Sequence, residues 1–292
     1  METAVFLGLN ALGDTLCTTP VLRAFRRAHP HVRMAYVVHA APYCHILDGN
    51  PDVDVLIYHE GLLHRGLDIC DNAWVHSLPL DLSGGGALYR LDLHAACTTA
   101  ATFHAHISHA FARLLSIPLD SVRPVIVLHE QDRRHARACT RGPYALLSMH
   151  SRANPPRPDG RGKVKDWPLD RWTTLAGTLR AAGLEVLCIG SEADERYPIP
   201  GTRHLYGLPI RTVAALIDEA AVFVTLENGL AHMAAAVDAP TVLLYSNIVP
   251  LVWARPAEST RCQIVYGDPF DASVDTVWSL VERTLAERRA CA

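Results

Sequence analysis

The sequence lacks the marks of several protein classes. No apolar run reaches the length of a membrane span, and no charged segment followed by a long apolar stretch opens the chain. The net charge of -3 comes without a block of like charge, which argues against nucleic acid as a partner. The eight cysteines form no Cys-x-x-Cys pair, so we expect reduced thiols. These absences predict a cytoplasmic protein without a transmembrane segment, with peripheral membrane contact left open.

What the sequence does have is a repeated alternation of strands and helices over 292 residues. A first series runs to about residue 140, and a basic, polar stretch at 130–141 carries a helix into the linker. A second series then begins with an apolar segment at 144–149. Alternation of this kind is typical of parallel sheets with right-handed crossovers. It predicts two Rossmann-like domains, 1–140 and 141–292.

Individual elements follow from propensity and patterning. We expect strands at 4–7, 34–38, 53–57, 72–76, 125–128, 144–149, 185–189, 222–225 and 241–245. We expect helices at 18–29, over most of 88–115, and at 169–182, 210–219, 232–237 and 274–288. The run Thr18-Thr19-Pro20 predicts the start of the first helix, because proline is favoured in the first helical turn.

The segment 221–236 carries the strongest functional signal. Its apolar start reads as a buried parallel strand, and its Ala-rich end favours a helix. Between them lie a carboxylate, an amide, a glycine and an imidazole: Glu227, Asn228, Gly229 and His232. A helix N-terminus behind a strand presents free N–H groups that suit phosphate, so this loop predicts a nucleotide-sugar site.

Two further loops follow expected strands. The first, 8–15, contains Gly13, which permits a tight turn, and Asp14, close to a helix start. The second, 148–168, is basic and includes Lys165. Ligands of open parallel sheets gather at the carboxyl ends of the strands. Glycosyl transfer needs a base that takes the proton of the acceptor hydroxyl, and positive groups that stabilise the departing diphosphate. These loops contain a carboxylate and cations that could do both.

At these residues the chain resembles the heptosyltransferase family of glycosyltransferases, glycosyltransferase family 9. Segment 12–26, LGDTLCTTPVLRAFR, resembles the family's N-terminal Gly-Asp signature. Segment 165–172, KDWPLDRW, resembles its Lys-x-Trp-Pro motif, and 186–192 fits the strand and turn that follow. Segment 225–232, TLENGLAH, is similar to its Asp-(Ser/Thr)-Gly-x-x-His loop. Three motifs occur in the family's order along nearly the whole chain.

The resemblance implies a GT-B-like α/β fold, in which two Rossmann-like domains face a central cleft. The first would bind the acceptor and the second the nucleotide sugar, with the last helix packing back on the first domain. It implies inverting, metal-independent transfer of heptose from ADP-heptose to lipopolysaccharide core or a small glycoside, in lipopolysaccharide biosynthesis. The donor is a co-substrate, and no cofactor or metal is expected, since lysine and helix dipoles replace a divalent ion.

The resemblance also implies residue roles. Asp14 would be the general base, and Lys165 would hold the diphosphate. The donor would meet His150, Ser151, Glu227, Asn228, Gly229 and His232. The acceptor side and its turn would be formed by Asn10, Gly13 and Thr15. Trp167 is expected to pack the loop rather than touch substrate.

Several positions depart from the family pattern. Glu227 stands where the family usually has Asp, Asn228 replaces a hydroxyl residue, Gly8 replaces a basic residue, and Ser246 begins an unusual segment after the strand at 241–245. Alternatives therefore stay open: another NDP-sugar with a natural-product acceptor, a non-catalytic nucleotide-sugar-binding protein, or a sugar-nucleotide 2-epimerase.

Three other features suggest sites less strongly. His94, His104, His106 and His109 lack a ligand-like pattern, so we interpret them as helix surface rather than a metal site. The run 84–86 of three glycines has no P-loop lysine after it and predicts a flexible loop. Segment 155–162 predicts a mobile excursion whose charges could close over the donor.

Overall fold

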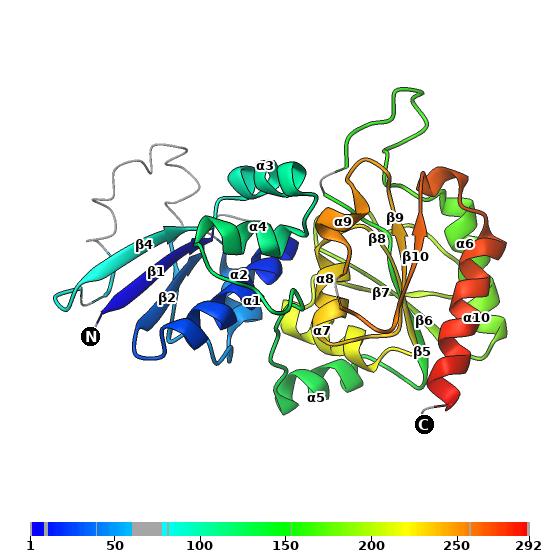
Figure 1. Cartoon of the computed structure of the whole chain (residues 1–292). Helices are drawn as coiled ribbons and strands as arrows, with labels where there is room; N and C mark the ends of the chain where they lie inside the picture. The colour runs from blue at the N-terminus through cyan, green and yellow to red at the C-terminus, as the bar shows by residue number, and fades with distance from the viewer. Residues whose placement is uncertain are drawn as a thin grey trace. The chain divides into compact units, whose positions relative to one another are not determined.

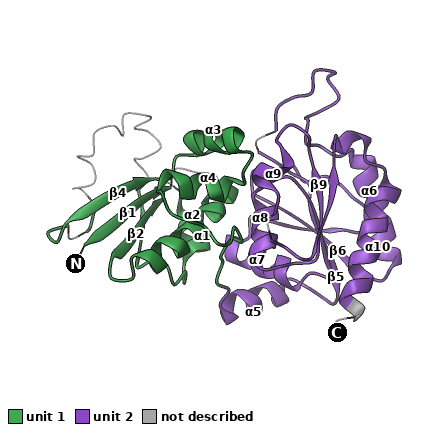
Figure 2. Ribbon diagram, viewed as in Figure 1, with its two compact units in different colours: residues 1–127 green, residues 128–292 purple. Residues whose placement is uncertain are grey.

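The computed structural model describes residues 2–8, 11–38, 40–59, 78–80, 82–152, 154–256 and 258–290. The chain divides into two compact units, residues 1–127 and 128–292 (Figures 1 and 2). Each is built from strands that alternate with helices, as the sequence predicts. Among the described residues, no helix is long and apolar enough to cross a membrane.

The first unit contains a parallel sheet in the order β3-β2-β1-β4. Its described strands are β1 (Thr3–Gly8), β2 (Arg33–Val38), β3 (Val55–Tyr58) and β4 (Gly86–Arg90). Its described helices are α1 (Leu12–Ala28), α2 (Ala41–Leu47), α3 (Leu93–Phe103) and α4 (Ile107–Leu114). Alternation along β1 divides its side chains between two faces. Val5 and Leu7 join one apolar cluster, while the Phe6 ring meets Phe25 of α1 at 5.0 Å between centroids.

Helix α1 begins six residues earlier than the sequence predicts, at Leu12 instead of residue 18, so Pro20 lies inside it. Proline removes the N–H that would bond the carbonyl four residues back. That carbonyl belongs to Leu16, and the Thr19 hydroxyl donates to it at 2.7 Å. The side chain beside the proline therefore satisfies the acceptor that the proline leaves open. The prediction that Thr18-Thr19-Pro20 opens the helix is wrong.

Other predictions for the first unit also need correction. Most of 88–115 is helical, as predicted, in α3 and α4, but the start of this range is wrong, because Gly86–Arg90 forms β4 and pairs with β1. Segment 125–128 is not a strand; the Val125 N–H instead donates to Thr19 Oγ1 at 2.8 Å. The strand expected at 72–76 lies outside the described residues.

The second unit contains a parallel sheet in the order β10-β9-β8-β5-β6-β7. Its strands are β5 (Tyr144–Ser148), β6 (Glu185–Gly190), β7 (Arg203–Tyr206), β8 (Val222–Leu226), β9 (Thr241–Tyr245) and β10 (Cys262–Tyr266). Its helices are α5 (Glu130–Ala138), α6 (Leu169–Ala181), α7 (Ile210–Glu219), α8 (Gly229–Ala236), α9 (Leu251–Ala254), the 3-10 turn η4 (Pro269–Asp271) and α10 (Val274–Ala290). The short strands β7 and β10 were not expected from the sequence.

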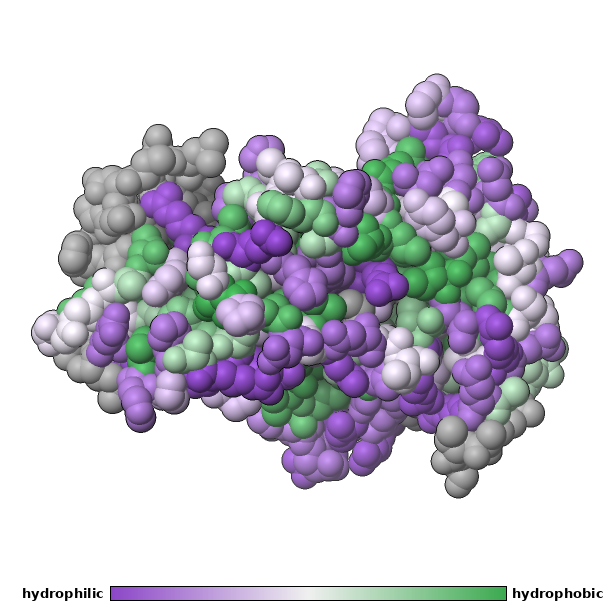
Figure 3. Space-filling view, viewed as in Figure 1, coloured by the Kyte–Doolittle hydropathy of each residue, from purple (hydrophilic) through white to green (hydrophobic). Residues whose placement is uncertain are grey.

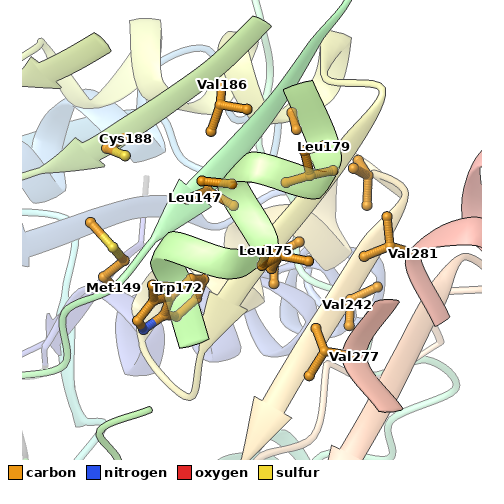
Figure 4. Close-up of a cluster of buried hydrophobic side chains, with 14 of the residues drawn as sticks. Leu147, Met149, Trp172, Leu175, Leu179, Val186, Cys188, Val242, Val277 and Val281 are labelled. Atoms are coloured by element: carbon orange, nitrogen blue, oxygen red, sulfur yellow. The ribbon is translucent and has the colours of Figure 1, made fainter. Parts of the chain in front are cut away.

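Helices cover both faces of this sheet. α6 and α10 lie on one face, and α7 and α8 on the other (Figure 1). Figure 4 shows Trp172, Leu175 and Leu179 of α6 pointing to the strands, with Val277 and Val281 of α10 in the same cluster. The described contacts of α10 are with α6, β8, β9 and β10. Its expected packing on the first domain stays a prediction.

The units divide before α5 rather than near residue 140, because α5 is tied to α7. Arg211 of α7 donates to Asp132 of α5 at 2.8 Å from Nη2 to Oδ2, with both side chains largely buried. Arg133 pairs with Asp218, and Arg137 Nη2 lies 2.8 Å from Glu219 Oε1. Three ion pairs and the buried Ala136 thus attach α5 to the second unit.

Candidate functional site

The polar groups of the second unit gather where its strands end. β5 leads into His150 and Ser151, β8 into Glu227 and Asn228, and β9 into Ser246. These three strands are neighbours in the sheet. The chain winds outward in opposite directions from β5 and β8, and such a reversal leaves a crevice at the carboxyl ends in doubly wound sheets. The residues predicted to face the donor therefore follow the strands at the topological switch point of this unit.

An ion pair lies at the centre of this group. Lys165 Nζ donates to Glu227 Oε1 at 2.8 Å, and the Ser246 hydroxyl donates to Glu227 Oε2 at 2.6 Å. The two charged side chains are only 8% and 12% exposed. A carboxylate directly after a buried strand needs a partner, and Lys165 is that partner. Lys165 is thus a buried residue of the site and not a solvated surface lysine.

The loop that carries Lys165 is braced from both sides. Asn154 Oδ1 accepts from the Lys165 N–H at 2.8 Å, while its Nδ2 donates to Asp166 Oδ1 at 2.7 Å. Trp167, as expected, packs inside: it meets Trp172 edge-to-face at 4.9 Å and donates Nε1–H to Ala272 O. Bonds on either side of Lys165 hold its backbone at the end of the sheet.

The start of α8 is fixed by Asn228. Its Oδ1 accepts from the Leu230 N–H at 2.9 Å, which caps the helix. Its Nδ2 donates to His150 O at 2.8 Å and Ser148 Oγ at 3.1 Å, across to β5. Gly229 is the first residue of α8. The substitution of an amide for a hydroxyl at Asn228 therefore adds a tie between β8 and β5.

His150 and Ser151 lie beside this cap but make different contacts. The Ser151 hydroxyl donates to Glu227 O at 2.9 Å. His150 Nε2 lies 3.0 Å from the Tyr206 hydroxyl, and its ring stacks on Tyr197 at 5.2 Å. Burial raises the pKa of Tyr206, so this hydroxyl stays protonated. His150 therefore belongs to an aromatic group at the ends of β6 and β7.

His232 lies in the second turn of α8 and is partly buried. Burial lowers its pKa to about 4, since the charged form loses its hydration. His232 is therefore neutral near pH 7. A neutral imidazole can both donate and accept a hydrogen bond, but it adds no positive charge to a phosphate site.

The segment 155–162, expected to be a mobile excursion, is anchored in the structure. Arg157 donates from Nη1 and Nη2 to the two oxygens of Asp268 at 2.8 and 2.7 Å. The guanidinium of Arg161 lies 4.5 Å from the centre of the Phe270 ring. An antiparallel bridge joins Pro156 to Lys163. Its closing over a donor stays a prediction.

In the first unit, Asp14 lies in the first turn of α1, where the helix dipole favours a negative charge. Its charge adds to burial in raising the pKa of Cys17. Gly13 and Thr15 are buried helical residues of the same turn, so Gly13 forms no left-handed turn. Asn10 lies outside the described residues. A role for Asp14 as base stays a prediction.

Gly8 ends β1, and the ring of Tyr36 crosses it. A Cβ at Gly8 would lie 2.6 Å from carbons of that ring. The Tyr36 hydroxyl lies 3.0 Å from Thr18 Oγ1. The packing of Tyr36 explains why a basic side chain, usual in the family at this place, does not fit here.

Within the described ranges, no three His, Cys, Asp or Glu side chains gather as metal ligands. The sequence does contain one Asp-x-Asp triplet, Asp52-Val53-Asp54. Both of its carboxylates face arginines of α1: Arg23 Nε lies 3.9 Å from Asp52, and Arg26 Nη2 lies 2.5 Å from Asp54. This triplet therefore serves the packing of α1 against the start of β3.

Sequence reasoning missed three contributors to the site: Ser246, Asn154 and Tyr206. Ser246 was noticed only as a departure from the family. A hydroxyl residue directly after an apolar strand was a usable signal, because strand ends form the site in such sheets. Tyr206 had no such signal, since β7 is short and partly exposed.

Two units built on parallel sheets, with polar residues at a switch point, define a GT-B-like glycosyltransferase fold. Solved structures of glycosyltransferases share this fold. The chain is similar to the glycosyltransferase family 9 protein of Veillonella parvula (17% identity, TM-score 0.73, 98% of this chain and 97% of that one). It is similar to E. coli ADP-heptose lps heptosyltransferase II (17%, 0.70, 99% and 100%).

A third similar structure is TibC, an iron-containing dodecameric heptosyltransferase of enterotoxigenic E. coli, in complex with ADP-D-beta-D-heptose (16%, 0.64, 99% and 76%). No curated protein matches the chain in sequence. The family model for glycosyltransferase family 9 (heptosyltransferase) matches residues 105–268, more than half of the chain. The chain belongs to that family and is a glycosyltransferase.

Proposed function

We propose that this glycosyltransferase transfers heptose from ADP-heptose to a hydroxyl of a saccharide acceptor, with inversion and without a metal. The observation that carries the proposal is the buried Lys165–Glu227 pair beside the N-terminus of α8. Two structural relatives act on or bind ADP-heptose according to their descriptions. Lipopolysaccharide core or a small glycoside is the proposed acceptor.

The donor's two chemical parts fit different groups of this site. One N–H of the Lys165 ammonium donates to Glu227, and the other two can donate to acceptors such as diphosphate oxygens. The N–H groups at the start of α8 add the positive end of a helix dipole. The Glu227 carboxylate keeps lone pairs that accept sugar hydroxyls. The leaving ADP would thus be stabilised by Lys165 and α8.

Asp14 is the proposed base, in the unit that would hold the acceptor. It would take the proton of the acceptor hydroxyl as the sugar is transferred, the Asp14 carboxylate becoming the acid and ADP leaving with the bond's electrons. Replacement Asp14→Asn keeps size and helix position but removes the base. We expect kcat to fall at least about 100-fold, with ADP affinity unchanged by calorimetry. Near wild-type turnover would disprove the assignment.

Another NDP-sugar is the second candidate donor, because Glu227, Asn228 and Ser246 all depart from the family pattern at the donor-facing edge. The test is a thermal shift with ADP, UDP, GDP and TDP at equal concentration, without metal. A nucleotide at about a hundred times its Kd stabilises by about 2.7 kcal/mol. A larger shift with ADP supports the proposal. A larger shift with another nucleotide would mean that the donor carries that nucleotide instead of ADP.

Metal independence is tested separately, since TibC is described as iron-containing. Purified enzyme would be dialysed against EDTA, then assayed with and without added Fe²⁺, Mg²⁺ or Mn²⁺. We expect equal turnover in all arms, because Lys165 and the α8 N-terminus supply the positive charge. Activity that returns only with one ion would overturn this part of the proposal.

A further inference from the structure

The chain has only two lysines, Lys163 and Lys165, against 25 arginines. Lys163 is exposed, whereas Lys165 is buried and paired. Arginine supplies nearly all positive charge elsewhere, so the ammonium at 165 is an exception in this chain. An ammonium is a compact point charge on a flexible stem, unlike the rigid planar guanidinium. Its position therefore depends on what holds it.

What holds Lys165 is Glu227, and Glu227 is itself held at several points. The Glu227 N–H donates to Leu244 O at 3.1 Å, and its carbonyl accepts from Ser151. These bonds fix the backbone but leave the side chain free to rotate. The hydrogen bond from the Ser246 hydroxyl to Glu227 Oε2, at 2.6 Å, fixes the plane of the carboxylate. Ser246 is 1% exposed, so it reaches Glu227 and not solvent.

We propose that Ser246 is a positioning residue, which orients the Glu227 carboxylate so that Oε1 keeps the Lys165 ammonium in place for the donor diphosphate. Serine has one hydroxyl proton, and the short O–H···O⁻ distance shows that it goes to the carboxylate. With Oε2 occupied, Oε1 remains for Lys165. The glutamate is one methylene longer than aspartate, and its end reaches the residue after β9.

This inference rests on the proposed function for its catalytic consequence, but its structural content can be measured without any substrate. Acetic anhydride acetylates amines, and the chain offers Lys163, Lys165 and the N-terminal amine. Peptide mass spectrometry then gives the rate at Lys165 relative to Lys163 in one sample. The exposed Lys163 is thus an internal standard.

The variants are Ser246→Ala, Glu227→Ala and the double variant. The matched control is Thr241→Val in β9, the strand that Ser246 follows: the Thr241 hydroxyl is also buried but donates to Ala239 O at the opposite end of β9. We expect Ser246→Ala to raise the relative acetylation of Lys165 several-fold, and Thr241→Val to leave it unchanged. Glu227→Ala should raise it further, and Ser246→Ala should then add nothing.

Turnover of ADP-heptose supplies the second measurement. Loss of a hydrogen bond to a charged group predicts a fall in kcat/KM of about tenfold or more for Ser246→Ala, and at most about twofold when Glu227 is already alanine. Unchanged acetylation of Lys165 overturns the inference, and so does an equal loss in both backgrounds. If the wild type turns over no ADP-heptose, the proposed donor fails, while the acetylation rates still decide the role of Ser246.

Discussion

Removing one partner of the buried Lys165–Glu227 pair should cost stability, whereas removing both should cost mainly donor binding. Replacing Lys165 by Met leaves a carboxylate that is 12% exposed and that has, within the described part of the chain, only the Ser246 hydroxyl as a partner. Breaking a buried ion pair on one side costs about 3–5 kcal/mol. The small remaining exposure lets water in, so we expect about 3 kcal/mol.

That loss is measurable in the second unit. A change of 1 kcal/mol shifts Tm by about 2–4 °C in a domain of this size, so Lys165→Met should lower Tm by about 6–12 °C. Urea unfolding at pH 7, followed by circular dichroism, gives the free energy directly. The double variant Lys165→Met, Glu227→Met replaces both charges by apolar groups, and we expect it to recover most of the stability.

Binding should not recover with stability. In both variants calorimetric titration with ADP should show at least about a tenfold weaker Kd, since the charge-assisted bond proposed between Lys165 and phosphate cannot form. A loss below about 1 kcal/mol in Lys165→Met would refute the burial argument. A double variant that binds ADP like the wild type would refute the role of Lys165.

Two further predictions concern pH and the anchored segment. The pKa of His232 falls to about 4 in the folded chain, so the unfolded chain takes up a proton at this residue first as the pH drops. The free energy of unfolding should therefore fall by up to about 2 kcal/mol from pH 7 to pH 5. His232→Gln should remove this part of the pH dependence, as measured by urea unfolding at each pH. Arg157→Ala removes the paired bonds to Asp268, which are worth about 1 kcal/mol of local stability, so cleavage after the exposed Lys163 by endoproteinase Lys-C should become about fivefold faster. Arg161→Ala removes a more exposed side chain that contacts Asp159 and Phe270 and should speed this cleavage less. Equal rates in the two variants would contradict the anchoring by Asp268.

Much of the second unit could be predicted from sequence because its strands are buried on both faces. β5, β8 and β9 are continuous apolar runs, and their positions match the prediction to within a residue. β7 and β10, with partly exposed residues, lie at the two edges of the sheet and lack such a run. A strand that is buried on both faces can be predicted from its continuous apolar run, and the two edge strands are not buried in this way.

The misplaced start of α1 has a different cause. Pro20 is a strong local signal for a helix start, but the Thr19 hydroxyl bonds the free Leu16 carbonyl and makes the proline tolerable inside the helix. Sequence rules for helix starts consider proline alone, whereas the proline inside this helix is tolerated because of the residue beside it. The consequence reaches the candidate base, because Asp14 lies in the first turn of α1 rather than in a loop before the helix.

The same limit separates the predicted site from the observed one. The motifs located Lys165 and Glu227 correctly at loops after strands, but nothing in either motif says that the two side chains pair. Pairing depends on β5 and β8 being neighbours, which is a property of the sheet order. Ser246 enters for the same reason, through β9 beside β8. Since the carboxylate of Glu227 has its two oxygens divided between partners from different loops, a change of one methylene at this position alters the whole group. Variation at Glu227 and at Ser246 should therefore be tested together, and never as separate departures from a family pattern.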